Sequence, residues 1–238
     1  MITVDKSRHW LEQQSIKRPS AIAFNYDGND VTYKEFYEEC LTAVKYLNDC
    51  GIKENENIGL LFEHTHVFFI VVNAIWLIGA VPVLFNSKIG RDEVANQAKR
   101  ADVKIIIASG ILFSDSSSRN TKTENPFSQF GIKLFFYEYK STGQQNPNFP
   151  SVIYPEFDIN KNALMLYTSG SSGKPKAAVH TFNSLFESVN ATDQFSQLSE
   201  NDVWLSSLPH FHIGGFMILL RALLTGGKVV YPNSLAFK

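Results

Sequence analysis

The stretch Tyr167-Thr168-Ser169-Gly170-Ser171-Ser172-Gly173-Lys174-Pro175-Lys176 decides how this chain is interpreted. It follows a compact apolar run, residues 163–167, that is typical of a buried strand, and it precedes a helix predicted from about Asn183. Its glycines allow a tight turn and a close approach to a ligand. Successive backbone N–H groups can form an anion-binding concavity, while hydroxyls and lysines add donors and positive charge. The stretch therefore predicts a loop that binds a polyphosphate.

The loop differs from the P-loop of nucleotidases, whose pattern is G-x-x-x-x-G-K-[ST]. Gly173-Lys174 is followed by Pro175, and no glycine lies five residues before Gly173. The other Gly-Lys pair, Gly227-Lys228, has Ala222 where the first glycine should stand. An ordinary Gly/Ser turn is the alternative interpretation, which the predicted strand before the loop and the helix after it make less favourable.

Size and charge limit the possible functions. The chain has 238 residues, of which 44% are hydrophobic, so it can bury a large core as one large domain or as two lobes. Its net charge is −1, without a basic stripe or a polybasic run, which argues against binding nucleic acid or an anionic membrane surface. The longest apolar stretch, residues 67–85, predicts helix, turn and strand rather than a membrane span, because it is interrupted by Asn73, Gly79 and Pro82.

Apolar runs and amphipathic segments alternate along the chain. The pattern predicts helices over residues 5–17, 33–49, 66–78, 91–100, 183–196 and 214–225. It predicts strands over 21–26, 57–62, 81–85, 104–108, 132–139, 163–167, 202–206 and 228–231, and polar loops over 114–128 and 141–150. Thr32 and Glu35 fit a capping box, and Gly51 ends the helix that they begin. This alternation favours an α/β fold with a mainly parallel sheet covered on both faces.

The glycine-rich stretch has the order [YF]-[ST]-S-G-[ST]-[ST]-G-x-P-K, and three other stretches accompany it: Thr32-Tyr33-Lys34-Glu35-Phe36, Ala74-Ile75-Trp76-Leu77-Ile78-Gly79-Ala80-Val81-Pro82-Val83 and Leu208-Pro209-His210-Phe211-His212-Ile213-Gly214-Gly215. In this order and spacing they resemble motifs of the adenylate-forming enzymes, which include acyl-CoA synthetases, peptide-synthetase adenylation domains and luciferases. The resemblance covers essentially the whole chain. It implies the layered sheets and helices of that family's large domain, incomplete at the C-terminus.

The same resemblance implies that this chain is the N-terminal portion of the large AMP-binding domain. One lobe would cover about residues 60–200, and a second would draw on about 1–59 and 202–238. Asn233-Ser234 resemble a helix cap with four residues after it, so we expect a longer parent protein. A small C-terminal domain with the catalytic lysine is expected outside this chain. No catalytic residue is then expected within it, and the chain alone is expected to be inactive or nearly so.

By resemblance, the loop would bind the β- and γ-phosphates of ATP through Thr168, Ser169, Gly170, Ser171, Ser172 and Gly173. Lys176 would neutralise phosphate charge, whereas Lys174 occupies a variable position. Carboxylate attack on the α-phosphate increases the charge on the departing pyrophosphate, and fixed amides and a cation stabilise that charge. The implied activity is ATP-dependent activation of a carboxylic acid and thioester formation with coenzyme A, with Mg²⁺ as the implied metal.

An acyl pocket is expected about forty residues downstream of the loop. By resemblance, His212 borders it with Gly214 and Gly215; the alternative is a packed histidine that supports the loop. Arg221 lies in a predicted helix that is apolar almost all round, so its guanidinium needs a partner. That partner is either a structural carboxylate, or water reached by snorkelling, or an anionic part of the substrate.

Histidines and cysteines do not predict a metal site. His210 with His212, and Glu63 with His64 and His66, lack further ligands at recognisable spacing. Two cysteines are too few for a disulfide framework, and together with the missing signal peptide they predict a cytoplasmic protein.

Within the family, the o-succinylbenzoate–CoA ligases of menaquinone biosynthesis are resembled at residues 204–209, His212, Gly215, residues 219–222 and His180-Thr181-Phe182. Their substrate is a dicarboxylate, so Arg221 would anchor a second carboxylate. The alternatives are a medium- or long-chain fatty acid or aryl acid–CoA ligase, a non-catalytic nucleotide-binding half-protein, and a structural or interaction domain. The expected partners are a small carboxylic acid and the downstream half of the enzyme, without nucleic acid or stable membrane insertion; a homodimer stays open.

Overall fold

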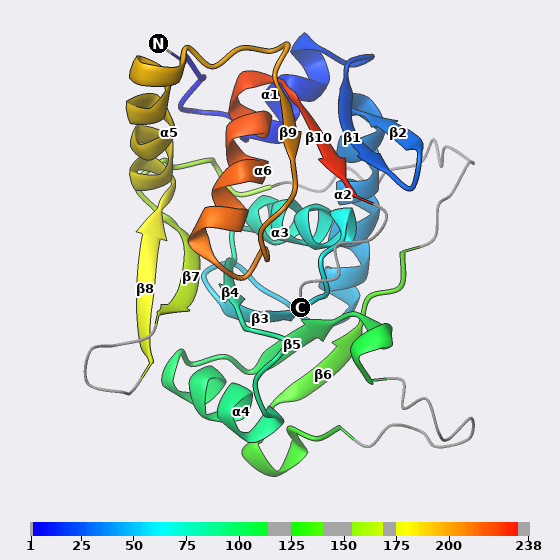
Figure 1. The fold of residues 1–238 in the computed structure, drawn as a ribbon. Coiled ribbons are helices and arrows are strands. Elements are labelled where there is room, and N and C mark those ends of the chain that lie inside the picture. The colour runs from blue at the N-terminus through cyan, green and yellow to red at the C-terminus, as the bar shows by residue number, and fades with distance from the viewer. Residues whose placement is uncertain (1, 114–124, 140–153, 169–174, 233–238) are drawn as a thin grey trace.

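Two sheets with helices between them form the architecture of the computed structural model, which describes residues 2–113, 125–139, 154–168 and 175–232. Figure 1 shows the smaller sheet at the upper right and the larger sheet below, with α3 between them and α4 on the far side of the larger sheet. The predicted α/β class is therefore confirmed.

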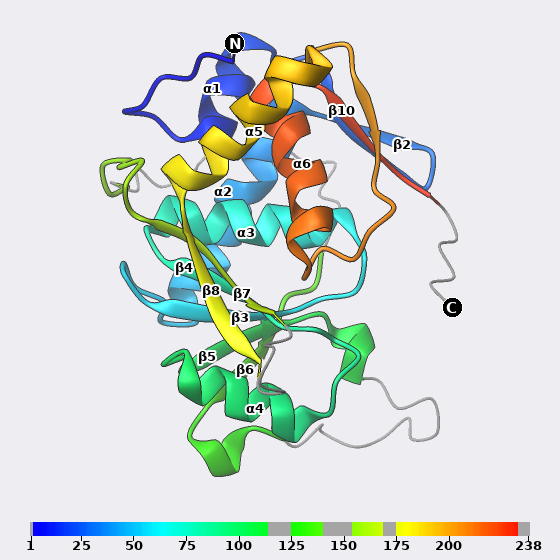
Figure 2. The ribbon, with the colours of Figure 1, turned by 60° about the vertical axis from the view of Figure 1, so that its left-hand side comes forward.

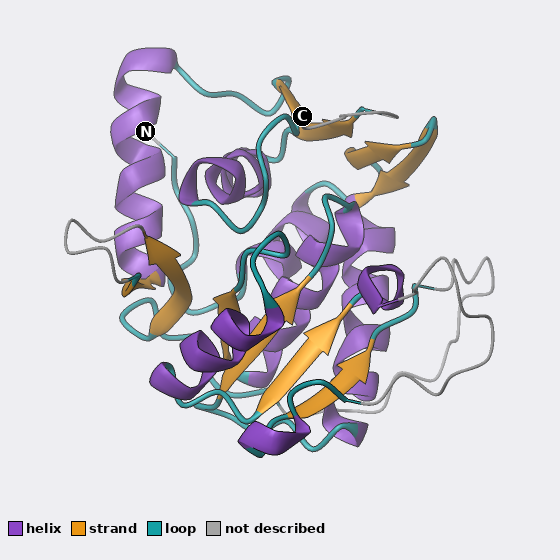
Figure 3. Cartoon of the chain, turned by 60° about the horizontal axis from the view of Figure 1, so that its bottom comes forward, coloured by secondary structure: helices purple, strands orange, loops and turns teal. Residues whose placement is uncertain are grey.

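The larger sheet has six strands in the order β6-β5-β3-β4-β7-β8. Its members are β3 (Asn57–Leu61), β4 (Val81–Leu84), β5 (Ile105–Ala108), β6 (Lys133–Phe136), β7 (Asn162–Thr168) and β8 (Lys176–Thr181). All neighbouring pairs are parallel except β7 and β8. Figure 3 shows helices on both faces of its parallel strands, as their apolar sequences predict.

Alternation along β5 shows how one strand serves two cores. Ile105 and Ile107 belong to the main core, which lies between the two sheets. Ile106 and Ala108 face the opposite side and pack with Val94 and other apolar residues of α4 (Arg91–Arg100). The period of two in a strand places successive side chains on opposite faces, so the continuous apolar run of β5 is buried on both.

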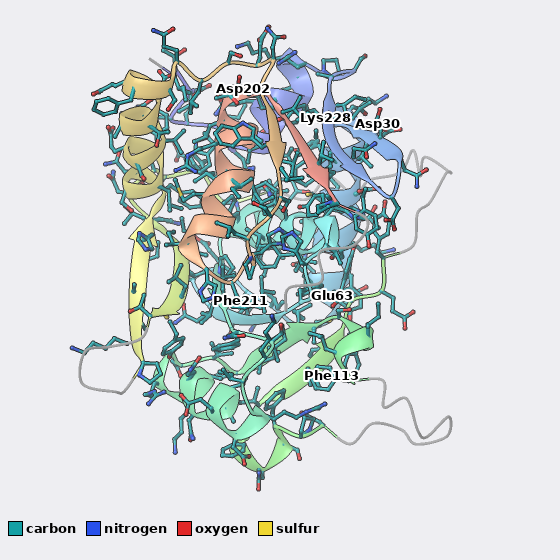
Figure 4. The ribbon with its side chains drawn as sticks, in the orientation of Figure 1. Asp30, Glu63, Phe113, Asp202, Phe211 and Lys228 are labelled. Carbon is teal, nitrogen blue, oxygen red and sulfur yellow. The ribbon has the colours of Figure 1, made fainter. Side chains whose placement is uncertain are left out.

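The smaller sheet has four strands in the order β2-β1-β10-β9. A hairpin of β1 (Ile22–Tyr26) and β2 (Asn29–Thr32) pairs through β1 with β10 (Lys228–Tyr231), which also pairs with β9 (Val203–Leu205). Lys228 Nζ donates to Asp30 Oδ1 at 2.9 Å, and Figure 4 labels both residues on this sheet. The sheet thus joins the beginning of the chain to its end.

The remaining helices are α1 (Trp10–Lys17), α2 (Tyr33–Asp49), α3 (His66–Ile78), α5 (Phe182–Ser196) and α6 (Ile213–Thr225), with short 3-10 turns over Gly110–Phe113 and Ser128–Phe130. The predicted capping box of α2 is present, since Thr32 Oγ1 accepts from the Glu35 amide and Glu35 accepts from the Thr32 amide. Gly51 follows α2 with φ 87°, a left-handed conformation that glycine adopts without strain. No helix among the described residues is long and apolar enough to cross a membrane.

Several predicted boundaries were wrong. The first helix begins at Trp10 rather than at residue 5, because Asp5 accepts hydrogen bonds from the Ser7 amide and hydroxyl and holds the preceding residues in a turn. The strands predicted over 132–139 and 202–206 are shorter, at 133–136 and 203–205. β8 was not predicted at all. The predicted loop 141–150, most of 114–128 and the suggested cap at 233–234 lie outside the described residues, and the division into lobes stays a prediction.

Candidate functional site

The hairpin of β7 and β8 carries the glycine-rich stretch at its tip. Thr168 ends β7 and Lys176 begins β8, and the two residues stand opposite each other in the antiparallel register. Ser169, Gly170, Ser171, Ser172 and Gly173 lie outside the described residues. The helix predicted from about Asn183 is confirmed, since α5 begins at Phe182, but the strand β8, which was not predicted, lies between the loop and this helix.

Tyr167, the first residue of the stretch, fixes this end of β7 to α4. Its hydroxyl donates to the Gln97 carbonyl oxygen at 2.6 Å, and its ring stacks with that of Phe85 at 6.1 Å. The Arg100 guanidinium lies 5.9 Å from the centre of the Tyr167 ring. The base of the loop is therefore held by both the sheet and the helix that covers it.

Polar side chains gather at the same edge of the sheet, beyond the carboxyl ends of β3 and β5. Ser109, directly after β5, donates through Oγ to Glu63 Oε1 at 2.8 Å, and Glu63 stands shortly after β3. Because β3, β4, β5 and β7 are parallel, β7 also ends at this edge, with Thr168 as its last residue. Ligands of open α/β sheets bind outside the carboxyl ends of the strands. In Figure 4, Glu63 and Phe211 lie between the lower end of α6 and the larger sheet.

A chain of hydrogen bonds joins this edge to the segment that leads into α6. His64 Nε2 lies 2.7 Å from the Ser206 carbonyl oxygen and 3.0 Å from Ser206 Oγ, and Ser206 Oγ lies 2.9 Å from His210 Nε2. A carbonyl only accepts, so His64 Nε2 carries the proton, and the Ser206 hydroxyl is left to donate to His210. Burial lowers the pKa of both imidazoles, which are neutral at pH 7.

Gly215 explains how that segment passes the first turn of α6. A Cβ atom at Gly215 would lie 2.2 Å from the Pro209 carbonyl oxygen and 2.6 Å from that of Leu208. At Gly214 the nearest atom would be Leu208 Cδ1 at 3.4 Å. The backbone of the Leu208–His212 segment therefore crosses α6 where position 215 has no side chain. His212 is the N-cap residue of α6 and is exposed, in contrast to the buried His210.

Arg221 lies two turns further along α6 and is half-buried. Its guanidinium carbon lies 5.8 Å from the ring centre of Trp204 in β9, a cation–π contact. Burial lowers the pKa of Arg221, and its Nε atom is buried without a hydrogen-bond partner among the described residues. No described carboxylate pairs with it within 4.0 Å. Arg221 thus keeps hydrogen-bonding capacity for an anion.

The possible metal ligands do not gather into one group. His66 turns away to the rings of Tyr26 and Tyr139, at 4.5 and 5.0 Å. Among the residues that the structure describes, no three or more His, Cys, Asp or Glu side chains could hold a metal ion together. Sequence reasoning missed the contacts of Ser109 with Glu63, of Ser206 with His64 and of Trp204 with Arg221, since each pair joins two different segments and no local spacing signals it.

Comparison with known proteins shows the family of this chain. The AMP-binding enzyme family model matches residues 11–237. The chain belongs to the AMP-binding enzyme family. Its curated relatives in the family include 2-succinylbenzoate–CoA ligases from Listeria monocytogenes serovar 1/2a, 28% identical over 92% of this chain, and from Bacillus mycoides (strain KBAB4), 26% identical over 93%. The chain spans 43% and 42% of the length of these relatives.

Solved structures share the AMP-binding fold. o-Succinylbenzoate coenzyme A synthetase from Bacillus subtilis, in complex with AMP, aligns with a TM-score of 0.80 and 22% identity over 95% of this chain and 56% of that chain. A putative long-chain-fatty-acid CoA ligase from Rhodopseudomonas palustris aligns with a TM-score of 0.76 and 19% identity over 95% of this chain and 57% of that chain. At these sequence identities, the structural similarity shows a shared fold.

Proposed function

We propose that this chain supplies the polyphosphate loop and the acid pocket of an ATP-dependent carboxylic acid–CoA ligase, with an aromatic dicarboxylate of the 2-succinylbenzoate kind as the acid. The observation that carries the proposal is the β7–β8 hairpin. It holds both ends of the family's loop, Thr168 and Lys176, at the sheet edge where Glu63, Ser109 and the segment before α6 converge.

The loop acts on the first step of the reaction. A carboxylate oxygen of the acid bonds to the α-phosphorus of ATP while the bond from that phosphorus to the bridging oxygen breaks, and pyrophosphate leaves. Charge then accumulates on the pyrophosphate, and the backbone amides of residues 168–173 with the ammonium of Lys176 stabilise it. In the second step the thiol of coenzyme A displaces AMP from the acyl carbon, and a thioester forms.

Arg221 selects the acid in this proposal. The acid enters beside the first turn of α6, where Gly214 is exposed, Gly215 lets the Leu208–His212 segment pass close to the helix, and His212 borders the entrance. One carboxylate reacts, and the second pairs with the Arg221 guanidinium, whose Nε lacks a described partner. Trp204 holds the guanidinium in place through its ring face. Pairing the half-buried guanidinium with a carboxylate also offsets part of the free-energy cost of removing the guanidinium from water.

One structure of o-succinylbenzoate coenzyme A synthetase from Bacillus subtilis is a complex with ATP and a magnesium ion. It aligns with a TM-score of 0.79 and 22% identity over 96% of this chain and 45% of that chain. In the described part of this chain, no group of three or more His, Cys, Asp or Glu side chains fits a metal site. Because Mg²⁺ is usually held by one or two carboxylates together with substrate phosphates, a magnesium ion bound with ATP would be held largely by the phosphates, whose charge it would neutralise.

Calorimetry on the chain tests the nucleotide part of the proposal. We expect ATP to bind with magnesium in the buffer and Lys176→Ala to weaken it about tenfold, which corresponds to about 1.4 kcal/mol. Lys99→Ala, at an exposed lysine of α4, is the matched control and should leave the affinity unchanged. Binding without pyrophosphate release is the result expected for this chain alone, whereas no heat at all would favour a structural or interaction domain.

Arg221→Leu tests the acid. Losing a charged hydrogen bond should weaken 2-succinylbenzoate about 10- to 100-fold, because such bonds contribute about 1.5–3 kcal/mol. Benzoate, which lacks the second carboxylate, should lose little. The measurement is the affinity of each acid for both proteins. Equal losses for the two acids would assign Arg221 a structural role and favour a monocarboxylic fatty or aryl acid as the substrate.

A further inference from the structure

A cleft lies at the opposite end of β7 from the glycine-rich loop. Four segments form it: residues 7–12 before and within α1, the end of α3, residues 154–162 before β7, and the start of α5. Its volume is about 140 Å³. Figure 2 shows α1 and α5 above α3, with the segment before β7 beside them. β7 has seven residues, so the cleft and the loop are about 20 Å apart at 3.3 Å per residue.

Aromatic rings make the inner wall of this cleft. Phe182 contacts Trp76 at 5.2 Å and Phe157 at 4.9 Å between ring centres, both edge to face. Trp76 and Phe182 are almost fully buried, and the Trp76 indole N–H is already used, since it donates to the Ala163 carbonyl oxygen at 2.6 Å. The wall therefore offers ring faces and edges to a ligand but no hydrogen bond from Trp76.

His9 adds a polar group to the same wall. It is 5% exposed, lies 5.9 Å from both Trp76 and Phe157, and neither of its ring nitrogens has a hydrogen-bond partner among the described residues. Burial lowers the pKa of His9 to about 3, so the ring is neutral and has one donor and one acceptor. Buried polar atoms normally have partners, and an unsatisfied one is costly. A ligand with a hydroxyl would satisfy one of them.

The charged side chains at the rim of the cleft determine which ligand charge the cleft favours. Arg8 pairs with Glu12 at 4.0 Å and Lys161 pairs with Glu54 at 2.8 Å, so both cations of the rim have carboxylate partners. Asp158 adds a further negative charge. A carboxylate ligand would meet this excess of negative charge without a free cation, whereas a neutral ligand meets no such penalty.

We propose that this cleft binds a neutral, single-ring phenol, with its ring against Trp76, Phe157 and Phe182 and its hydroxyl hydrogen-bonded to His9. The volume fits, because a cavity of about 150 Å³ accommodates benzene. The site is independent of the proposed ligase activity, since it shares no residue with the loop, with His212 or with Arg221.

The indole N–H signals of the protein in a proton–nitrogen NMR spectrum test this site. The chain has three tryptophans, and Trp→Phe variants assign their signals. Titration with phenol should shift the Trp76 signal saturably, with a dissociation constant on the order of 1 mM, as expected for so small a ligand. Trp204, beside Arg221, should not respond to phenol. Toluene should bind more weakly than phenol, and benzoate should leave Trp76 unchanged.

His9→Phe keeps an aromatic ring and removes both ring nitrogens. It should weaken phenol about tenfold, the loss of one hydrogen bond, and leave toluene unchanged. His180→Phe, on β8, is the matched control and should change neither. An unmoved Trp76 signal, benzoate binding as tightly as phenol, or wild-type protein that does not prefer phenol to toluene would each overturn the proposal. This last comparison needs no substitution, and none of these outcomes bears on ATP or 2-succinylbenzoate binding.

Discussion

Glu39 and Tyr139 show how a single contact ties distant parts of this chain together. The Tyr139 hydroxyl donates to Glu39 Oε1, and the two residues are 100 positions apart. Glu39 lies on α2, and Tyr139 follows β6. Burial raises the pKa of Glu39 to about 7, while the hydrogen bond from Tyr139 opposes that rise. The carboxyl group is therefore partly protonated at neutral pH.

Glu39→Gln should change the pH dependence of stability. The folded-state pKa is about 7 and the ordinary value 4.5, so native stability is complete below pH 4.5 and falls as the pH rises through 7. Glutamine still accepts from Tyr139 and never ionises. We expect equal stability near pH 4.5 and a variant more stable by about 2 kcal/mol at pH 8, below the full linkage value because Glu39 is partly exposed.

Urea unfolding at both pH values measures this difference. Glu38→Gln is the control, since Glu38 is the neighbour that pairs with Lys34 at 3.8 Å. Parallel stability curves for wild type and Glu39→Gln between pH 4.5 and 8 would show that burial of this carboxyl costs nothing.

Arg221 also contacts a residue of another element. Its sequence setting, a cation in an apolar helix, indicated that it needed a partner. The structure shows Trp204 as that partner, which a sequence pattern could not identify because Arg221 and Trp204 belong to different elements. Its role toward an acid stays a prediction, as do the roles of Lys176 and His212.

Among the elements, α6 and the segment before it depend on one missing side chain. Gly215→Ala should destabilise the protein by about 2 kcal/mol or more, because its Cβ would meet two backbone oxygens that cannot move without displacing the segment. The gain in helix propensity, at most about 1 kcal/mol, does not offset that clash.

Gly214→Ala is the matched comparison. Its Cβ would meet only the end of the Leu208 side chain at 3.4 Å, so the variant should be neutral or stabilised by up to about 1 kcal/mol. Denaturant midpoints of the two variants give the test. Similar midpoints would mean that the segment shifts freely and does not pack tightly on α6.

Across the whole molecule, the main core joins both sheets. It contains Phe24 and Val229 of the smaller sheet and Leu60 and Leu164 of the larger one. In addition, the Tyr33 hydroxyl donates to the carbonyl oxygens of Ala222 at 3.0 Å and Gly227 at 2.7 Å, and so connects α2 to the end of α6. A shared core of this kind favours unfolding of both sheets together.

We therefore expect one cooperative unfolding transition, with coincident curves from tryptophan fluorescence and far-ultraviolet circular dichroism. Tyr33→Phe should shift both curves equally, by about 1–2 kcal/mol for the lost hydrogen bonds. Thr42→Ala, on the exposed face of the same helix, is the control. Two separated transitions, or a shift in one probe alone, would show that the sheets unfold independently.

Patterns along the amino-acid sequence were enough to predict the α/β class, nearly every helix and strand, the capping box of α2 and the motif that led to the family. These features depend on local periodicity and backbone conformation, which short segments carry in their own residues. β8 was missed because the strand conformation of Lys176–Thr181 depends on its antiparallel pairing with β7, and not on a local sequence pattern.

Which residues of different segments contact one another became clear from the folded chain. It joined His64 to Ser206 and His210, placed Trp204 on Arg221, and closed a cleft around His9 from four separate segments. Contacts between residues far apart in the chain depend on how whole elements pack, so no spacing along the sequence reports them.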